Sequence, residues 1–322
     1  MAEALKQAKS IVLTTHVRPD GDALGSTAAL WRAAAGAGKR ARVVLLDAIP
    51  QRYGYLLADA APAPAEQFDD LAERADLIVV VDTCAFGQLG PIDSALRARR
   101  AKVAVIDHHA TADTVGARIW QDTSAAAAGV MIAELLDDLG WRIDANMAEA
   151  LLAAIAMDTG WFRHANTDAR ALSAAARLVA AGVEPDRLYA RLYQADRPQR
   201  LALLAAALRS LELSCNGRLA IISLTAEDFA RTGARADETE DVVNEGLRIA
   251  TVEVSAILIP TSDMGTRISL RSRGAVDVAA IAASFGGGGH VRAAGFKDRG
   301  DPRDAKRRLV AACADALARA AC

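Results

Sequence analysis

The sequence predicts an α/β protein with a parallel-sheet N-terminal domain that has helices on both faces, a helical linker and a smaller mixed α/β C-terminal domain. Continuous apolar strands alternate with helical stretches in the first half, which is typical of a parallel sheet covered on both faces. The pattern becomes helical from residues 124 to 194, and strands return from residue 218 onward. A chain of 322 residues is also long for one domain, so two are expected.

The individual elements follow from apolar runs and helix signals. Short apolar, β-branched runs predict strands at residues 11–15, 42–46, 77–81 and 103–106. Helical periods predict helices at residues 23–35, 147–157, 169–181 and 197–211. In the second half, strands are expected at residues 219–224, 252–260 and 267–272, and helices near residues 237–249, 277–283 and 302–320. We place the domains at residues 1–190 and 213–322, joined by a helical linker at residues 191–212.

Composition and charge exclude several classes of protein. Hydrophobic residues make up 52% of the chain and charged residues 24%, which favours a folded core over disorder. A formal net charge of −2 argues against a protein that grips long nucleic acid, although metal ions or local cations could hold a small anion. The four cysteines lack metal-finger spacing, and the chain shows no signal pattern or membrane-spanning run. We therefore expect reduced thiols and a soluble, cytoplasmic protein with no membrane partner.

Acidic and histidine residues gather at the ends of predicted elements in the first half. A single aspartate at such a junction is commonly a helix N-cap, so each one alone has an ordinary structural explanation. That explanation weakens as the coincidences accumulate, because doubly wound sheets bind ligands outside the carboxyl ends of their strands. The candidate residues are His16, Asp20, Asp22, Asp82, Asp107, His108, His109 and Asp158.

This set of side chains fits divalent metal ions. Imidazole and carboxylate together suit transition metals such as manganese. Four carboxylates would offset the charge of two such ions, namely those of Asp20, Asp22, Asp82 and Asp158. Asp82 could bridge the ions at roughly 3.5–4 Å, the spacing of two-metal hydrolytic sites. Two cations acting on one bridging water would lower its pKa and make hydroxide available for in-line attack on phosphorus.

The two adjacent histidines are expected to have different roles. His108 and His109 should point in different directions at a strand end, so we do not expect both to bind one ion. One could ligate a metal, and the other could donate to the phosphate or the leaving oxygen. A buried, structurally satisfied histidine remains the alternative for His109.

Four motifs in order resemble those of the DHH phosphoesterase superfamily. They are HVRPDGDALGS at residues 16–26, VVVDT around Asp82, DHH at residues 107–109 and AMDTGWF around Asp158. The tripeptide alone is weak, whereas four ordered motifs are specific. ISLRS at residues 268–272 and GGGGHVRAAGF at residues 286–296 extend the resemblance over nearly the whole chain. Within the superfamily, the chain resembles the bacterial bifunctional oligoribonucleases (nanoRNases) and pAp phosphatases that carry a DHH-associated C-terminal domain.

The resemblance implies a role for each of these residues. Residues 1–190 would form a catalytic domain that binds two divalent ions, manganese foremost. One ion would lie among His16, Asp20, Asp82 and Asp158, and the other among Asp22, Asp82, His108 and Asp158. The division of Asp158 between the two ions stays open. Asp107 is expected to orient a ligand histidine, and His109 is expected to contact the substrate phosphate.

The glycine-histidine segment of the second domain also has a physical interpretation. Consecutive glycines permit positive φ and let bare backbone amides approach an anion, and a histidine and an arginine add cationic donors. A flexible loop would explain the glycines but not the histidine. The resemblance implies that residues 213–322 bind the distal phosphate or base of the substrate through Arg271, Gly287, Gly288, Gly289 and His290. Arg273 and Arg292 could assist, with a solvated surface role as the alternative.

The function expected from this pattern is hydrolysis of dinucleotides and very short oligoribonucleotides to mononucleotides, and of 3′-phosphoadenosine 5′-phosphate (pAp) to AMP. Alternatives within the same chemistry are a phosphodiesterase for cyclic dinucleotides or pApA, and a pyrophosphatase or exopolyphosphatase. A non-catalytic nucleotide-binding module should have lost a metal ligand, yet all six are present. We expect the metals on one domain and the substrate anchor on the other, and a short substrate rather than long nucleic acid. A homodimer is implied by the resemblance.

Overall fold

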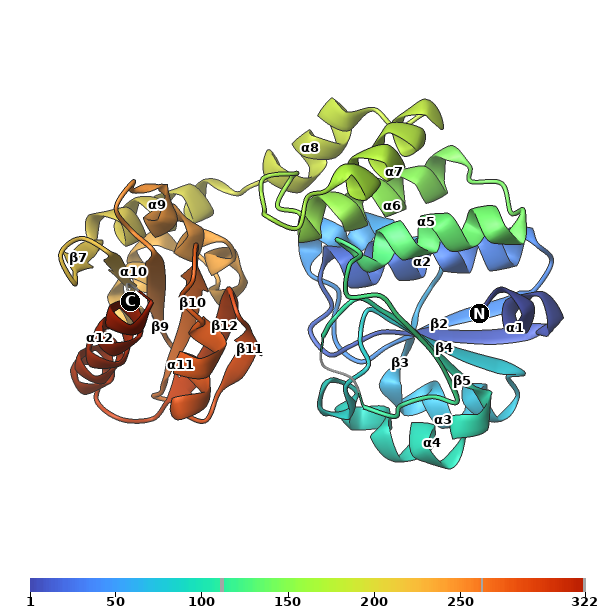
Figure 1. Ribbon diagram of the computed structural model, residues 1–322, viewed down its shortest axis with the longest axis horizontal. Coiled ribbons are helices and arrows are strands. Elements are labelled where there is room, and N and C mark those ends of the chain that lie inside the picture. Colours follow the sequence, from blue (N-terminus) through green and yellow to red (C-terminus); the bar gives the residue numbers. More distant parts are fainter. Residues whose placement is uncertain (111–112, 262, 321–322) are drawn as a thin grey trace. The chain divides into compact units, whose positions relative to one another are not determined.

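The computed structural model describes residues 1–110, 113–261 and 263–320 (Figure 1). Contacts within the chain divide it into two compact units, Met1–Ala195 and Asp196–Cys322. Each unit is built on one six-stranded sheet. In the part of the chain that is described, no helix combines the length and the apolar character needed to cross a membrane.

The first unit contains a wholly parallel sheet, as predicted, and its strand order is β3-β2-β1-β4-β5-β6. Its strands are β1 (Ser10–Thr14), β2 (Arg40–Leu45), β3 (Ala63–Pro64), β4 (Leu77–Val81), β5 (Val103–Asp107) and β6 (Arg118–Gln121). The apolar runs correctly predict β1, β2, β4 and β5. The sequence analysis missed β3, which has two residues, and β6, whose side chains are exposed or half-buried and form no apolar run.

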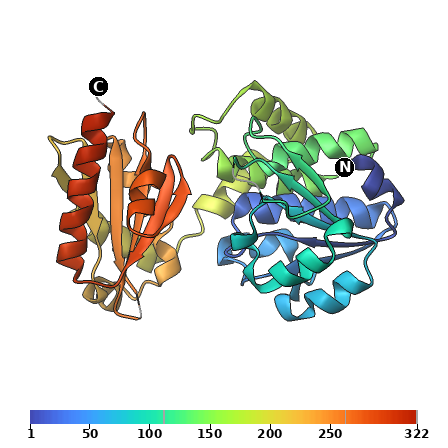
Figure 2. The same ribbon diagram turned by 60° about the horizontal axis from the view of Figure 1, so that its bottom comes forward.

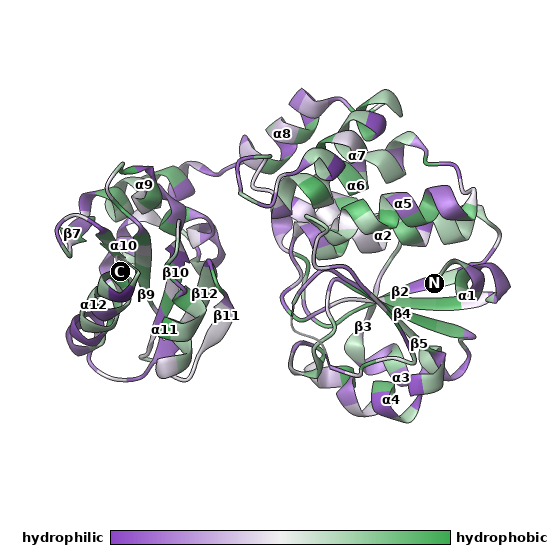
Figure 3. Ribbon diagram, in the orientation of Figure 1, coloured by the Kyte–Doolittle hydropathy of each residue, from purple (hydrophilic) through white to green (hydrophobic). Residues whose placement is uncertain are grey.

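Helices cover both faces of this sheet (Figure 1). One face carries α2 (Gly21–Gly36), α5 (Ala128–Leu139) and α6 (Ala145–Asp158), and the other carries α3 (Phe68–Glu73) and α4 (Asp93–Ala98). Successive residues of β1 alternate between the two cores, since Ile11 and Leu13 join the first and Val12 joins the second. The central strands are therefore apolar on both faces, as the green colouring in Figure 3 shows.

Further helical segments complete the first unit. The α-helices are α1 (Ala2–Gln7), α7 (Ala169–Ala180) and α8 (Pro185–Tyr193). The 3₁₀ turns are η1 (Gln51–Leu57), η2 (Ala65–Gln67), η3 (Phe86–Gln88), η4 (Gly90–Ile92) and η5 (Arg100–Lys102). The helical run predicted after residue 124 is thus α5 to α8.

Small residues bring α2, α5 and α6 into close contact. A Cβ atom at Gly25 of α2 would lie 2.3 Å from the carbonyl oxygen of Ala150 and 3.0 Å from Cβ of Ala154 in α6. A Cβ atom at Gly129 of α5 would lie 2.7 Å from the same Cβ of Ala154. The backbones can approach this closely only because glycine has no side chain. Since α6 ends at Asp158, this packing also determines where that carboxylate lies.

The second unit contains the predicted mixed α/β fold, with the strand order β11-β12-β10-β9-β8-β7. Its strands are β7 (Glu212–Ser214), β8 (Leu219–Ser223), β9 (Val254–Pro260), β10 (Thr266–Ser272), β11 (Gly288–His290) and β12 (Ala293–Asp298). β8 and β9 are parallel, and the other neighbouring pairs are antiparallel. One face is covered by α11 (Val278–Ser284) and α12 (Pro302–Arg319), and Figure 2 shows α12 lying along the strands.

The other face of the second sheet is covered by α9 (Pro198–Arg209) and η7 (Val242–Arg248). The sequence analysis places α9 within a linker at residues 191–212. In the structure, α9 packs into the core of the second unit through Leu203, Ala206 and Ala207.

Two features of this unit differ from the sequence prediction. The helix expected near residues 237–249 consists of two 3₁₀ segments, η6 (Ala236–Thr239) and η7. Asp241 lies between them with a left-handed φ of 66°, and this conformation interrupts a right-handed helix. The sequence analysis also missed α10 (Ala226–Thr232), which begins at a capping box formed by Thr225 and Asp228.

Gly25→Ala should destabilise the first unit, because the added methyl group would overlap the backbone of α6. We expect a loss of about 1–3 kcal/mol in the free energy of unfolding, the usual cost of overpacking. The matched control is Gly36→Ala in the same helix, where a Cβ atom would meet nothing within 4 Å. Urea unfolding of both variants measures the difference, and equal stabilities would contradict this account of the α2–α6 contact.

Candidate metal centre

Three neighbouring strands bring candidate side chains to one edge of the first sheet. His16 follows β1, Asp82 follows β4, and Asp107 is the last residue of β5. These strands are adjacent and parallel, so their carboxyl ends lie side by side. Helices supply other candidates at the same edge, with Asp22 in the first turn of α2 and Asp158 at the end of α6.

The tips of these side chains converge around Asp82. Its Oδ2 lies 3.6 Å from Nε2 of His16, and its Oδ1 lies 3.4 Å from Nε2 of His108. Nε2 of His108 also lies 3.7 Å from Oδ2 of Asp22 and 3.8 Å from Oδ2 of Asp158. Asp22 and Asp82 are almost wholly buried, with 1% and 2% of their surface exposed.

The potential ligand atoms form three groups, in each of which all atoms lie within 4.8 Å of one another. The groups are His16 with Asp20 and Asp82, Asp22 with His108 and Asp158, and Asp82 with His108 and His109. All six residues that the sequence analysis selects as metal ligands are thus brought together. Asp82 belongs to two of the groups, and Asp158 lies with Asp22 and His108.

Backbone carbonyls hold two of the histidine rings. Nδ1 of His16 lies 2.9 Å from the carbonyl oxygen of Val17, and Nδ1 of His108 lies 3.2 Å from that of Ala125. These contacts favour the tautomer in which Nδ1–H donates to the carbonyl oxygen. The lone pair of Nε2 then faces the carboxylates in both rings, which is the arrangement that a metal-binding histidine needs.

Two observations fit a cation at this centre. Oδ1 of Asp82 and Nε2 of His108 are buried and face each other at 3.4 Å, without a hydrogen bond of good geometry to any described residue. Buried polar atoms are normally paired, so a ligand is expected for these two. Asp82 also has a left-handed backbone φ of 65°, which is uncommon outside glycine and clusters at functional sites. The mixture of imidazole and carboxylate donors suits divalent transition metals.

Crowding and burial shift the pKa values of this centre. Burial, followed by the charge of Asp82, raises the pKa of Asp22 well above its ordinary value, and burial raises the pKa of Asp158 to about 6. Burial opposes ionisation of Asp82 as well, but His108 and His16 outweigh it and hold the pKa of Asp82 below its usual range. Burial lowers the pKa of each histidine, yet Asp82 raises that of His16 to about 9 and that of His108 to about 10. The centre therefore attracts positive charge.

The glycine-histidine segment of the second unit forms a hairpin strand, so the flexible-loop alternative is wrong. β11 pairs with β12. A Cβ atom at Gly287 would lie 2.3 Å from the carbonyl oxygen of Gly295, and one at Gly289, which has a φ of 141°, would lie 2.5 Å from that of Ala293. These two glycines are required by the close approach of the strands. A Cβ atom at Gly288, in contrast, would meet nothing within 4 Å.

Arg271 and His290 project from the same face of the second sheet. Arg271 of β10 lies opposite Ala293 of β12, and Ala293 lies opposite His290 of β11. Directly opposite residues of antiparallel strands share a face, so a single alanine separates the guanidinium from the imidazole. Burial lowers the pKa of Arg271, but arginine keeps its charge in proteins. An anion could therefore meet both side chains above Ala293.

Arg273 and Arg292, the two arginines that could assist in binding the substrate, have different surroundings. Nη2 of Arg273 donates to the carbonyl oxygens of Ile249, at 3.2 Å, and Ala250. This contact closes the end of η7 and gives Arg273 a structural role. Arg292 is exposed.

Comparisons with known proteins identify both units. A family model described as the DHH family N-terminal domain matches residues 10–155, and a DHHA1 domain model matches residues 217–318. The bifunctional oligoribonuclease and PAP phosphatase NrnA of Thermus thermophilus is 34% identical over 99% of this chain and 94% of its own length. The chain belongs to the DHH family of phosphoesterases. We refer to its two units as the DHH domain and the DHHA1 domain.

Solved structures share this fold. An exopolyphosphatase-related protein from Bacteroides fragilis has a TM-score of 0.92 at 24% identity, over 97% of this chain and 95% of that protein. The exonuclease RecJ, solved with manganese bound, has a TM-score of 0.52 at 18% identity, over 98% of this chain and 93% of that structure. At these identities the likeness is one of fold.

The two histidines of the motif that names the DHH family lie close together. The rings of His108 and His109 lie 4.5 Å apart, and Nε2 of His108 and Nδ1 of His109 lie 3.4 Å and 3.7 Å from the same oxygen of Asp82. Both rings therefore lie beside Asp82, with their planes tilted by 51°. Both residues lie beyond the end of β5, where the alternation of side chains along a strand no longer applies.

Asp107 of the DHH domain contacts His109 rather than His108. Its Oδ1 accepts hydrogen bonds from Nδ1 of His109 at 2.8 Å and from the backbone N–H of His109 at 3.2 Å. The ring that Asp107 orients is thus the one expected to contact substrate, whereas the carbonyl of Ala125 orients His108.

Two contributors to the DHH domain's centre were missed by the sequence analysis. The N-terminus of α5 has no capping side chain of its own, and the carboxylate of Asp22 accepts the N–H groups of Ala128 at 2.6 Å and Gly129 at 2.9 Å instead. Nδ2 of Asn166 donates to the carbonyl oxygen of Asp158 at 3.2 Å and lies 3.4 Å from its Oδ2. An alanine run and a lone asparagine carry no pattern that would have revealed these contacts.

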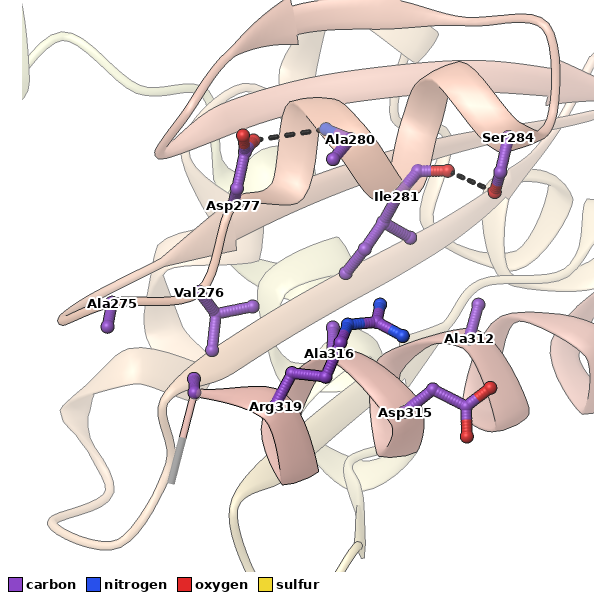
Figure 4. Close-up of a pocket in the computed structure, with 11 residues that line it drawn as sticks. Ala275, Val276, Asp277, Ala280, Ile281, Ser284, Ala312, Asp315, Ala316 and Arg319 are labelled. Atoms are coloured by element: carbon purple, nitrogen blue, oxygen red, sulfur yellow. Dashed lines mark hydrogen bonds between the residues drawn. The ribbon is translucent and has the colours of Figure 1, made fainter. Parts of the chain in front are cut away.

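The DHHA1 domain has a separate pocket between α11 and α12, with a volume of about 450 Å³ (Figure 4). Its lining consists of Ala275, Val276, Asp277, Ala280, Ile281, Ser284, Ala312, Asp315, Ala316, Arg319 and Ala320. The predicted substrate-binding residues are not among them. Arg271 and His290 face away from these helices, since α11 and α12 pack on the neighbouring residues Leu270 and Ile268 of the opposite face.

Addition of Mn²⁺ should raise the melting temperature of the protein, because a cation that binds only the folded DHH domain stabilises it. At 100 times the dissociation constant, one site contributes about 2.7 kcal/mol. Asp82→Asn should abolish most of the shift, since Asp82 belongs to two ligand groups. The control Asp138→Asn alters an exposed carboxylate on α5 and should keep the shift. An unchanged shift in Asp82→Asn, measured by thermal unfolding with and without EDTA, would contradict the assignment of the centre.

Proposed function

We propose that this DHH-family protein is a manganese-dependent phosphoesterase that cleaves very short oligoribonucleotides to mononucleotides and pAp to AMP. The observation that carries the proposal is the convergence of imidazoles and carboxylates from the ends of β1, β4, β5 and α6 and the start of α2 around Asp82. Similarity over nearly the whole chain to a protein named as an oligoribonuclease and PAP phosphatase supports this choice of substrate.

Two metal ions would be held by two sets of ligands that share Asp82. His16, Asp20 and Asp82 would hold one ion, and the other would be held by Asp22, Asp82, His108 and Asp158. When bound, two divalent cations lower the pKa of a water molecule and neutralise charge on the phosphoryl oxygens. Manganese is favoured by the resemblance to the DHH superfamily, and the mixed imidazole and carboxylate donors are compatible with it.

His109 would bind the phosphate that is cleaved. Asp107 is wholly buried and accepts the hydrogen bond from Nδ1 of His109, which restricts the orientation of the ring. Burial lowers the pKa of His109, but the attraction of Asp107 and Asp82 outweighs burial and raises it. The hydrogen bond to Asp107 favours the cationic form of the imidazole, and a cationic donor suits an anionic ester oxygen.

The DHHA1 domain would bind a second phosphate or the base of the substrate. Arg271 offers a planar fork of donors that matches phosphate oxygens, and His290 adds a donor on the same face. Ala293 between them is small and leaves room for an anion. Gly288 belongs to the same hairpin, and the space above its backbone is open.

Product analysis in the presence of Mn²⁺ tests the proposed substrates. We expect pAp and a ribodinucleotide to be hydrolysed faster than pApA, c-di-AMP, pyrophosphate and a longer oligoribonucleotide offered side by side. Asp82→Asn should lose activity on every substrate, by on the order of a thousandfold, because both ligand sets are damaged. Asp138→Asn should keep the activity of the wild type.

The competing outcomes are distinct. Faster release of phosphate from pyrophosphate than from pAp would identify a pyrophosphatase, and fastest turnover of c-di-AMP would identify a cyclic-dinucleotide phosphodiesterase. Equal rates on a dinucleotide and a long strand would remove the restriction to short substrates. Full activity of Asp82→Asn would refute the metal-dependent mechanism.

Arg271→Ala should raise KM for pAp by about ten- to hundredfold, the cost of one or two lost hydrogen bonds to a charged group. Arg271→Lys should recover part of this loss, because it keeps the charge without the fork. Arg299→Ala changes an exposed arginine of the same domain and serves as the control. Steady-state kinetics separate KM from kcat, and an unchanged KM in Arg271→Ala would exclude Arg271 from the binding site.

A further inference from the structure

One short backbone segment contacts two members of one ligand group and is linked to the third by a side chain. The segment comprises residues 125–129, and we call it the tether segment. The carbonyl oxygen of Ala125 lies 3.2 Å from Nδ1 of His108, and the N–H groups of Ala128 and Gly129 donate to the carboxylate of Asp22 at 2.6 Å and 2.9 Å. The third ligand, Asp158, is reached indirectly through a side chain.

That side chain is Asn166, which links the tether segment to Asp158. Its Nδ2 lies 3.0 Å from the carbonyl oxygen of Ala126, 3.2 Å from the carbonyl oxygen of Asp158 and 3.4 Å from Oδ2 of Asp158. The amide has two hydrogens, so it can donate to Ala126 and to Asp158 at the same time. The same piece of backbone therefore contacts, or is linked to, all three ligands of the group, which are Asp22, His108 and Asp158.

The tether segment is itself held firmly in place. Its four alanines are buried, each with 4% or less of its surface exposed. Gly129 packs so closely on Ala154 of α6 that a Cβ atom would lie 2.7 Å from Cβ of Ala154. Because α6 ends at Asp158, the helix that carries this carboxylate and the segment that holds the other two ligands are packed against each other.

Asp158 needs such a contact more than the other ligands do. It is the last residue of α6, where the carbonyl groups at the end of the helix repel a carboxylate. Asp22 is in the opposite situation, because it lies in the first turn of α2 and caps the start of α5. An amide donor beside Asp158 partly offsets the unfavourable end of the helix, and its contact with Oδ2 at 3.4 Å favours one orientation of the carboxylate.

We propose that Asn166 is a positioning residue that presets Asp158 for the metal ion shared with Asp22 and His108. The inference rests on the proposed metal-dependent function and names a residue outside the ligand sets. The other ligand group, His16 with Asp20 and Asp82, makes no hydrogen bond with Asn166 among the described residues. Loss of the amide should therefore weaken one of two metal ions and leave the other unchanged.

Titration of the full-length protein with Mn²⁺ tests this proposal, with free Mn²⁺ followed by electron paramagnetic resonance. The wild type should bind two ions per chain. Asn166→Ala should weaken one of them by about ten- to hundredfold, the usual effect of removing a partner of a metal ligand. Asn166→Thr, which fills a similar volume without the amide, should behave alike. The control is Asn146→Ala, which changes an exposed asparagine near the other end of α6 and should bind both ions normally.

Two Mn²⁺ ions bound as tightly by Asn166→Ala and Asn166→Thr as by the wild type would overturn the proposal. A purely structural role would also overturn it, and would appear as a lower melting temperature in EDTA with unchanged Mn²⁺ affinities. Failure of the wild type to bind a pair of ions would instead refute the proposed function. The two failures are therefore distinguishable in one titration series.

Discussion

The architecture of the DHH domain depends on one electrostatic constraint, which is that carboxylates buried at the end of its sheet must be matched by donors and positive charge. Moving an ionised group out of water without a partner for its charge has a very high cost in free energy. Asp22 is matched by the first N–H groups of α5, and Asp82 faces His16 and His108. The starting point of α5 and the orientation of both rings follow from this matching. The centre is thus part of the fold rather than an addition to it.

Capping and metal ligation are compatible roles for these aspartates. Oδ1 of Asp20 accepts the backbone N–H groups of Asp22 and Ala23, which makes Asp20 the N-cap of α2. Asp20 also belongs to a ligand group with His16 and Asp82. A carboxylate has two oxygens, so one can cap a helix while the other faces a cation. From the sequence alone the two roles are alternatives for each aspartate, whereas the structure allows both for one residue.

The sequence predicted what depends on a run of similar residues and missed what depends on single contacts. β1, β2, β4 and β5 were predictable because they are apolar on both faces, and the polar residues at strand ends then indicated the site. The two-residue strand β3 and the broken helix at Asp241 have no such signal. The contact between Ala126 and Asn166 joins residues 40 positions apart through a backbone carbonyl. Every residue has a carbonyl, so composition and spacing cannot reveal which one is used.

Small residues explain how a chain with few large side chains can hold the candidate metal ligands in place. Aromatic residues make up only 4% of the chain, and several contacts that set the centre are made by backbone groups. Gly25 and Gly129 let α2 and α5 approach α6 until main-chain atoms and methyl groups touch. Backbone atoms have no side-chain rotamers. Contacts between backbones therefore restrict the positions of Asp22 and Asp158 more than packing between long side chains would. The DHHA1 domain uses the same device, because Gly287 and Gly289 bring β11 against β12 and thereby place His290 in register with Arg271. In both domains, glycine acts on the site by setting the separation of backbones that carry or orient the functional groups.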